Sequence, residues 1–270
     1  MENVITISWL ANHLDNPDLV ILDASHAAVG GQKPPYPDVR IKGARRFDID
    51  YFSNQESSLP HMLAPADVFD KKVRALGINQ DSHLVIYDNL GIYSSPRAWW
   101  MFKIMGHQKV SVLDGGLPQW IGEGHEVEKV ELATYEAGDF EGTLQPEMVK
   151  SMEEVKENLG ARAFQLIDAR SSGRFEGTAP EPRPQLKSGH IPNSINIPFQ
   201  EVLENGRYKT TEELKRLFGP HENKPLVFSC GSGLTACIVM LAAELISDGE
   251  KAVYDGSWTE WASEKGNPID

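Results

Sequence analysis

Leu19-Val-Ile-Leu-Asp-Ala24 and Phe164-Gln-Leu-Ile-Asp-Ala169 decide the fold, because they open two copies of one pattern. Each is a short apolar run that ends in Asp-Ala, as expected of a strand buried on both faces. Three further matches follow in the same order: Ile41–Ala44 with Ile191–Ser194, Leu84–Asp88 with Leu226–Cys230, and Val112–Trp120 with Val253–Trp261. This internal repeat predicts that the two halves of the chain have the same architecture.

Helical patterns separate the expected strands, for example at Arg97–Met105 and Thr235–Ile246. Strands that alternate with helices predict an α/β fold, in which each half is a parallel β-sheet flanked by helices on both faces. Weak periodicity, with Gly138, Gly142 and Pro146 among several acidic residues, predicts a linker between the repeats at residues 136–145. We therefore expect an N-terminal domain at 1–135 and a C-terminal domain at 146–270.

Charge and composition exclude several functional classes. The 270 residues include 26 Lys and Arg against 39 Asp and Glu, a formal net charge of −13. An acidic field disfavours nucleic acid and anionic membranes, so neither is expected as a partner. The first residues lack a basic region followed by an apolar run, which predicts a cytoplasmic location. The most apolar stretch, Cys237–Ile246, is too short to span a membrane and contains Glu244.

The two cysteines, Cys230 and Cys237, form neither a disulfide framework nor a C-x-x-C pair. Since no spaced His, Asp or Glu set fits a metal either, we expect no metal and no cofactor. Cys237 lies inside the apolar helical pattern, where a cysteine packs as a small hydrophobic residue. Cys230 has a different setting.

Cys230 ends a predicted strand, and Asp88 ends the matching strand of the first half. In open parallel sheets, ligands bind beyond the carboxyl ends of the strands. Gly231 and Gly233 allow a tight loop whose N–H groups turn inward, and the helix that follows adds its positive end. Such a cradle stabilises an anion such as a thiolate or persulfide. We therefore expect a catalytic C-terminal domain and a non-catalytic N-terminal domain.

The loop Cys230-Gly-Ser-Gly-Leu-Thr235 resembles the active-site loop of the 3-mercaptopyruvate sulfurtransferases, within the tandem-domain rhodanese superfamily. That family usually has Val where this chain has Leu234, and related thiosulfate sulfurtransferases have Arg-Lys in place of Gly231-Ser232. The resemblance covers essentially the whole chain. It implies two tandem rhodanese-like domains, and it makes residues 231–235 the sulfur-binding loop.

A second motif carries the same resemblance. Gly173-Arg-Phe175 and Pro180-Glu-Pro-Arg183 resemble the substrate segment of these enzymes, in which arginines at the positions of Arg174 and Arg183 hold the substrate. Thiosulfate enzymes generally lack the second arginine. Guanidinium groups also suit a 2-oxo acid on chemical grounds, since they form paired hydrogen bonds with its oxygens. Arg170, next to a strand end, is expected to be structural.

Two residues of the loop, Ser232 and Thr235, have hydroxyl side chains. The Ser232 hydroxyl is expected near the reacting sulfur, where it can donate to substrate or pass a proton. Thr235 is expected to cap the following helix with its side chain. The Asp-Gly pairs that precede Trp120 and Trp261 are explained by turn chemistry, and no catalytic role is predicted there.

The sequence departs from the family at one histidine. Many members have His-Ile-Pro-Gly-Ala, with a histidine proposed to join a proton relay, where this chain has Arg40-Ile-Lys-Gly-Ala44. Either no such relay is needed or Arg40 contributes charge at the domain interface. The sequence alone does not place Asp38 or His61. His190, in the matching position of the second half, is expected to be structural and bonded to backbone groups.

The resemblance implies transfer of sulfur from 3-mercaptopyruvate through a Cys230 persulfide to a thiol such as thioredoxin, or to cyanide, with release of pyruvate. The alternative is a thiosulfate:cyanide sulfurtransferase that uses the same cysteine. A cysteine phosphatase would need arginine at position 236, where the chain has Ala236. A non-enzymatic rhodanese-like binding module is disfavoured because Cys230 is retained.

Overall fold

The computed structural model describes residues 2–28, 31, 33–131, 133–221 and 224–270. The chain forms two compact units. Unit 1 consists of Met1–Gln55, Leu63–Gln145 and Asn205–Tyr208, and unit 2 of Glu56–Met62, Pro146–Glu204 and Lys209–Asp270. Two short segments thus belong to a different unit from their neighbours in sequence.

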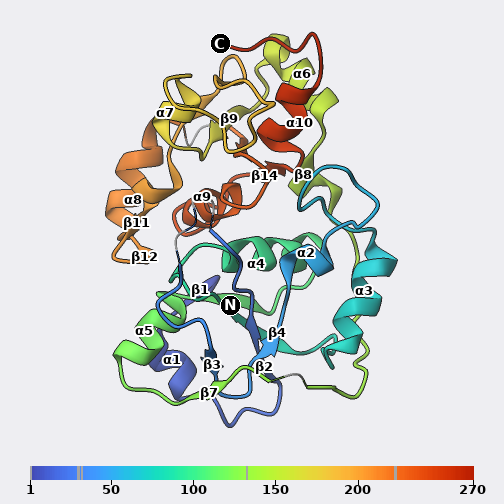
Figure 1. Ribbon diagram of the computed structural model, residues 1–270, viewed down its shortest axis with the longest axis vertical. Helices are drawn as coiled ribbons and strands as arrows, with labels where there is room; N and C mark the ends of the chain where they lie inside the picture. Colours follow the sequence, from blue (N-terminus) through green and yellow to red (C-terminus); the bar gives the residue numbers. More distant parts are fainter. Residues whose placement is uncertain (1, 29–30, 32, 132, 222–223) are drawn as a thin grey trace. The chain divides into compact units, whose positions relative to one another are not determined.

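A five-stranded parallel sheet forms the centre of unit 1 (Figure 1). Its order is β1-β6-β5-β2-β4, and its strands are β1 (Val4–Ile5), β2 (Leu19–Asp23), β4 (Arg45–Arg46), β5 (His83–Tyr87) and β6 (Val110–Leu113). Residues of β5 are all buried, as a central parallel strand requires. A separate antiparallel pair joins β3 (Val39–Ile41) to β7 (Val127–Lys129).

Helices cover both faces of this sheet. Val85 and Tyr87 of β5 join one cluster with residues of α1 (Ile7–Ala11) and α5 (Gly116–Gly122). Leu84 and Ile86 are equally buried but face the other side, because neighbouring residues of a strand point to opposite faces. There α4 (Ser95–Ile104) packs on β5 and β6. The helices α2 (Ile49–Phe52) and α3 (Ala66–Ala75) add Phe52 and Phe69 to an aromatic cluster with Phe102 of α4.

Unit 2 repeats this sheet. Its order is β8-β14-β13-β9-β10, all parallel, with β8 (Val149–Lys150), β9 (Gln165–Asp168), β10 (Ile195–Asn196), β13 (Leu226–Ser229) and β14 (Lys251–Tyr254). The two sheets therefore have the same order of equivalent strands, in agreement with the sequence repeat. The central strands that match are β5 and β13, which end immediately before Asp88 and Cys230.

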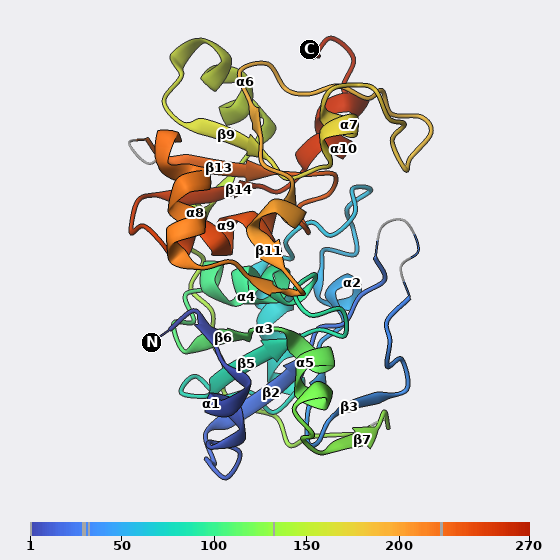
Figure 2. The same ribbon diagram turned by 90° about the vertical axis from the view of Figure 1, so that its left-hand side faces the viewer.

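The helices of unit 2 also lie on both faces (Figure 2). Val155 of α6 (Met152–Ala161) and Trp258 and Trp261 of α10 (Ser257–Ser263) pack in one cluster on the sheet. The helix α9 (Ala236–Glu244) also packs on β13 and β14, and it contacts α8 (Thr211–Phe218). The first eight residues of α9 are all buried. Shorter elements of unit 2 are α7 (Ser172–Phe175), β11 (Leu203–Glu204) and the 3-10 turns Pro146–Met148, Phe199–Val202 and Gly219–His221, whereas β12 (Arg207–Tyr208) belongs to unit 1.

Local sequence explains where two of these helices begin. The Ser151 hydroxyl accepts the N–H of Glu154, whose carboxylate accepts the N–H of Ser151, and Thr210 and Glu213 repeat this capping box at α8. The predicted α/β class with helices on both faces is thus confirmed. Among the described residues, no helix combines the length and the apolar character that crossing a membrane requires.

Candidate active site

Cys230 lies at the carboxyl end of β13 and is buried, with 2% of its surface exposed. The loop 231–235 follows it and leads into α9. Gly233 has a φ of 76°, a left-handed conformation that glycine adopts without strain. Thr235 occupies the N-cap position of α9, but its side chain makes no capping hydrogen bond. The expectation that Thr235 caps with its hydroxyl was therefore wrong.

The first turn of α10 fixes the backbone of the nucleophile. The Cys230 carbonyl accepts the Trp258 N–H at 3.0 Å, and the Gly231 carbonyl accepts the Thr259 N–H at 3.0 Å. In a trans peptide the carbonyl and the next N–H point in opposite directions. Since both carbonyls face α10, the N–H groups of Gly231 and Ser232 point away from it. This is the orientation that an anion cradle in this loop needs.

Ser257 adds a further contact with the nucleophile. Its hydroxyl accepts the N–H of Cys230 at 3.2 Å and donates to the Tyr254 carbonyl at 2.8 Å. Ser257 holds a φ of 51°, a strained value for a residue with a side chain. The equivalent position in unit 1 is Gly116, where a Cβ atom would come within 2.4 Å of the Asp88 carbonyl.

In unit 1 the loop that matches the Cys230 loop surrounds the carboxylate of Asp88. The Asp88 carbonyl accepts the Leu117 N–H at 3.0 Å, as the Cys230 carbonyl accepts the Trp258 N–H in unit 2. The buried Asp88 carboxylate accepts main-chain N–H groups of the loop that follows it, from Leu90, Tyr93, Ser94 and Ser95. A side chain of the protein therefore uses the N–H groups that a bound anion would need.

Arg174 lies against the loop beside the cysteine. A Cβ atom added to Gly231 would lie 3.0 Å from Nη2 of Arg174, so a side chain at position 231 would crowd the guanidinium group. Two hydrogen bonds hold Arg174 there: Nε and Nη2 donate to the two carboxylate oxygens of Glu181 at 3.1 and 2.6 Å. Glu181 comes from the predicted Pro180–Arg183 motif, although the sequence drew attention only to its arginine.

Arg170 anchors this arrangement to the sheet. Its fully buried side chain donates to the carboxylate of Asp168, at the end of β9, and to Oε1 of Glu181 at 2.9 Å. It also donates to the Gly189 carbonyl and stacks on the ring of Trp258 at 4.2 Å. The predicted structural role of Arg170 agrees with this geometry.

Arg183 reaches the same loop by another route. Its Nη1 donates to Oγ1 of Thr259 at 3.3 Å, and the Thr259 hydroxyl donates to the Gly231 carbonyl at 2.5 Å. Arg174 and Arg183 are nine residues apart in sequence. Arg174 lies directly beside Gly231, and Arg183 is connected to the Gly231 carbonyl through the Thr259 hydroxyl. The structure thus brings both predicted arginines to the loop of Cys230.

Ser232 has a partner that the sequence did not identify. Nδ1 of His61 lies 3.1 Å from Oγ of Ser232, and His61 belongs to the segment Glu56–Met62 of unit 2. The two residues are 171 positions apart, and His61 takes a left-handed φ of 61°. No spacing rule connects residues so far apart, so only the fold reveals the pair.

The remaining residues singled out in the sequence have structural partners. Arg40 donates to the Glu128 carboxylate at 2.7 Å, and to the Glu131 carbonyl, within unit 1. His190 contacts the Phe175 carbonyl through Nδ1, and its imidazole stacks on the Phe175 ring, as expected of a structural histidine. Cys237 is buried in α9, where its thiol donates to the Gly233 carbonyl at 3.3 Å.

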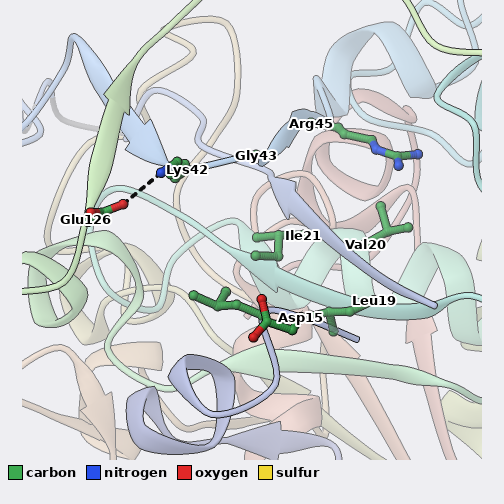
Figure 3. A pocket seen from close by; sticks show the side chains of 9 residues that line it. Asp15, Leu19, Val20, Ile21, Lys42, Gly43, Arg45 and Glu126 are labelled. Carbon is green, nitrogen blue, oxygen red and sulfur yellow. Dashed lines mark hydrogen bonds and ion pairs between the residues drawn. The ribbon is translucent and has the colours of Figure 1, made fainter. Parts of the chain in front are cut away.

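A hollow in unit 1 is lined by none of the residues that the sequence predicts for the site. Its volume is about 370 Å³, and β2 lines it together with Asp15, Lys42, Arg45 and Glu126 (Figure 3). Lys42 and Glu126 form an exposed ion pair at 2.9 Å. Arg45 donates to the carbonyls of Leu76 and Gly77. The charged side chains of Lys42, Glu126 and Arg45 thus all bond to partners within unit 1.

The Asp255–Trp261 segment contains residues that the sequence did not identify as functional. Turn chemistry accounted for its Asp-Gly pair, yet Ser257 and Thr259 bond to the backbone of Cys230 and Gly231. The repeat could have drawn attention to Ser257, because the matching position in the first half is a glycine.

Comparison with known proteins shows the family to which the chain belongs. The rhodanese-like domain family matches twice, at residues 6–123 and 151–264. The 3-mercaptopyruvate sulfurtransferase of Mus musculus is 43% identical, over 96% of this chain and 91% of the relative. The mitochondrial thiosulfate/3-mercaptopyruvate sulfurtransferase 1 of Arabidopsis thaliana is 40% identical, over 100% of this chain and 78% of the relative.

A solved structure extends the likeness to three dimensions. The crystal structure of the 3-mercaptopyruvate enzyme SseA from Escherichia coli superposes with a TM-score of 0.85. It is 37% identical and covers 96% of this chain and 99% of its own. With two matched domains and full-length relatives, the chain belongs to the tandem-domain rhodanese family, in the group of the 3-mercaptopyruvate sulfurtransferases.

Proposed function

We propose that this protein is a sulfurtransferase that moves sulfur from 3-mercaptopyruvate, through a persulfide on Cys230, to a thiol or cyanide. The single observation that carries the proposal is the position of Arg174, whose guanidinium lies against Gly231, the residue next to the nucleophile. Its Nη1 atom is not among the atoms that bond to Glu181, so it can receive an oxygen of a 2-oxo acid.

The first half-reaction follows from this arrangement. The donor's carboxylate and carbonyl bind to Arg174 and Arg183, which places its sulfur atom near Cys230. The Cys230 thiolate attacks that sulfur, a sulfur–sulfur bond forms, and the carbon–sulfur bond breaks. The bonding electrons leave with pyruvate as its enolate, whose negative charge the two arginines stabilise.

The enolate must then take up a proton at carbon. Ser232 and His61 form a hydroxyl–imidazole pair within unit 2, and such a pair can pass a proton from the donor thiol or from solvent. In the second half-reaction, an acceptor thiolate attacks the outer sulfur and Cys230 leaves as the thiolate. Thioredoxin is the proposed protein acceptor, and cyanide can take its place in an assay.

Catalysis is confined in this proposal to the C-terminal half. In unit 1 the carboxylate of Asp88 stands where unit 2 has the thiol, and no donor enters that loop. We propose a cytoplasmic location from the sequence, although the Arabidopsis relative is named as mitochondrial. Thiosulfate is the alternative donor, because the name of the same relative includes both compounds.

A comparison of donors on the purified protein tests the proposal. Each donor is added without acceptor, and the peptide that contains Cys230 is examined by mass spectrometry for one additional sulfur atom. We expect the persulfide on Cys230 with 3-mercaptopyruvate, and release of one pyruvate for each persulfide formed. Faster loading from thiosulfate would favour the alternative donor, and loading of neither compound would contradict the proposal.

A further inference from the structure

The hydroxyl of Thr259 stands between a substrate-binding arginine and the loop of the nucleophile. It donates its hydrogen to the Gly231 carbonyl at 2.5 Å and accepts a hydrogen bond from Nη1 of Arg183 at 3.3 Å. Thr259 lies in the first turn of α10 and is buried, with 7% of its surface exposed. Its position is fixed independently, because its N–H donates to the same Gly231 carbonyl.

Arg183 needs such a support. It lies between Pro182 and Pro184, which are both exposed, and an unrestrained arginine side chain has many rotamers. Within the described part of the chain, the bond to Thr259 is the hydrogen bond that the structure records for the Arg183 side chain. The location of its charge therefore depends on one neutral hydroxyl.

The neutrality of that hydroxyl distinguishes the two arginines. Arg174 faces the carboxylate of Glu181 through two hydrogen bonds, which compensate part of its charge. Thr259 orients Arg183 without compensating its charge, so the charge remains available for an anionic substrate group. The hydrogen of the hydroxyl is used by the Gly231 carbonyl, which leaves the oxygen free to accept from the guanidinium.

We propose that Thr259 is a positioning residue that holds Arg183 beside the loop and thereby favours donors with a 2-oxo carboxylate group. This inference rests on the proposed function. Its test uses Thr259→Val, which keeps the shape of the side chain and the N–H bond to Gly231 but removes the hydroxyl. The second variant, Thr259→Ser, keeps a hydroxyl at this position.

We expect Thr259→Val to lower kcat/KM for 3-mercaptopyruvate roughly 3- to 10-fold, the effect of one uncompensated hydrogen bond. Thr259→Ser should stay within about twofold of the original protein. Combined with Arg183→Gln, Thr259→Val should cause no additional loss, since the residue acts through Arg183. Loading of Cys230 from thiosulfate should change by less than about twofold. Thr211→Val, an exposed change in the same unit, is the matched control.

Three results would overturn the inference. Thr259→Val could have the same kcat/KM for 3-mercaptopyruvate as the original protein. Its loss in kcat/KM could add fully to the loss caused by Arg183→Gln. It could also slow the reactions with both donors equally, through its effect on the Gly231 carbonyl. Where thiosulfate turns over too slowly to measure, the double variant decides. Failure of the proposed function looks different, because the unaltered protein would then not form a Cys230 persulfide from 3-mercaptopyruvate.

Discussion

The carboxylate of Asp88 accepts two hydrogen bonds from Ser95, one from the main-chain N–H at 2.9 Å and one from the hydroxyl at 2.7 Å. Both end on Oδ2, which also accepts the N–H groups of Tyr93 and Ser94. The loop that would surround a sulfur anion in a catalytic domain here surrounds a carboxylate of the protein itself. Asp88 thus stabilises its loop and fills the place of a ligand.

Asp88→Asn should therefore reduce stability more than turnover. An amide cannot accept on both of its atoms, so at least one N–H group loses its partner and every remaining bond loses charge assistance. We expect a loss of about 1.5–3 kcal/mol in the free energy of unfolding, measured with chemical denaturant. Turnover of 3-mercaptopyruvate by the folded variant should stay close to that of the original protein. A large fall in kcat with the fold intact would make unit 1 a catalytic partner.

The two cysteines should respond in opposite ways to substitution. Cys230→Ser removes the nucleophile with little change in volume, so sulfur transfer should be abolished while the far-ultraviolet dichroism spectrum stays the same. Cys237→Ala removes a buried thiol that bonds to the Gly233 carbonyl, and we expect about 1 kcal/mol of destabilisation with turnover largely retained. Persulfide formation in the Cys230 variant would show that another group accepts the sulfur.

The sequence predicted the fold because each half satisfies the same local rules. Apolar runs of β2 and β9 end in Asp-Ala, the linking helices are amphipathic or fully apolar, and the two sheets have one strand order. The repeat also located Cys230 by contrast with Asp88. These features lie in short stretches of chain, where periodicity and composition are informative.

Contacts between distant segments could not be predicted in this way. Ser232 and His61 are 171 residues apart, and Arg183 and Thr259 are 76 apart, so no local pattern relates them. Thr235 shows a different limit. A threonine before a helix predicts a side-chain cap, but in this structure Thr235 has helical backbone angles, with φ −74° and ψ −16°. A capping side chain needs an extended backbone at that position.

The Ser232–His61 pair should act as a unit. Ser232→Ala removes the hydroxyl, and His61→Gln removes the imidazole that contacts it at 3.1 Å. If the pair passes the proton to the enolate, each change should lower kcat by about 100-fold or more, and the double variant should be little worse than either single variant. The measurement is single-turnover pyruvate release at several pH values. Additive losses would mean that the two residues act separately.

Burial of His107 makes the stability of unit 1 depend on pH. Burial lowers the pKa of His107 from its ordinary value of 6.5, and the charges of Lys109 and Lys103 act in the same direction, while backbone hydrogen bonds with Ser82 and Lys109 oppose part of this effect. The unfolded chain then binds a proton more readily than the folded one, so protonation favours unfolding. The stabilisation is complete above about pH 6.5 and decreases as the pH falls below that value. The pKa of His83 is lowered for the same main reason.

His107→Gln should weaken this dependence, because an amide can still donate to the Ser82 carbonyl that Nε2 contacts at 2.9 Å, but does not titrate. Thermal unfolding followed from pH 7.5 to 5.5 should show a smaller decrease in Tm for the variant than for the original protein. The half-buried His125 provides the control variant, His125→Gln. Equal decreases in Tm for His107→Gln and the original protein would assign the pH dependence to other groups.

The two arginines should respond differently to the identity of the donor. Arg174 touches the loop residue next to Cys230 and Arg183 is held by Thr259, so both can bind a 2-oxo acid. Thiosulfate is tetrahedral and lacks the carboxylate and carbonyl pair of a 2-oxo acid, so it offers Arg183 no planar group to bind. Arg183→Gln removes charge-assisted hydrogen bonds worth about 1.5–3 kcal/mol, or roughly 10- to 150-fold in kcat/KM for 3-mercaptopyruvate.

Steady-state kinetics with both donors, at fixed acceptor concentration and ionic strength, measures this difference. We expect Arg183→Gln to reduce the reaction with 3-mercaptopyruvate much more than any reaction with thiosulfate, because only the first donor needs both guanidinium groups. Arg174→Gln should reduce both reactions, since its charge lies beside the nucleophile's loop whichever donor is bound. Equal losses for Arg183→Gln would reduce its role to general electrostatic attraction. No loss at all would make Arg183 a surface residue and favour thiosulfate as the donor.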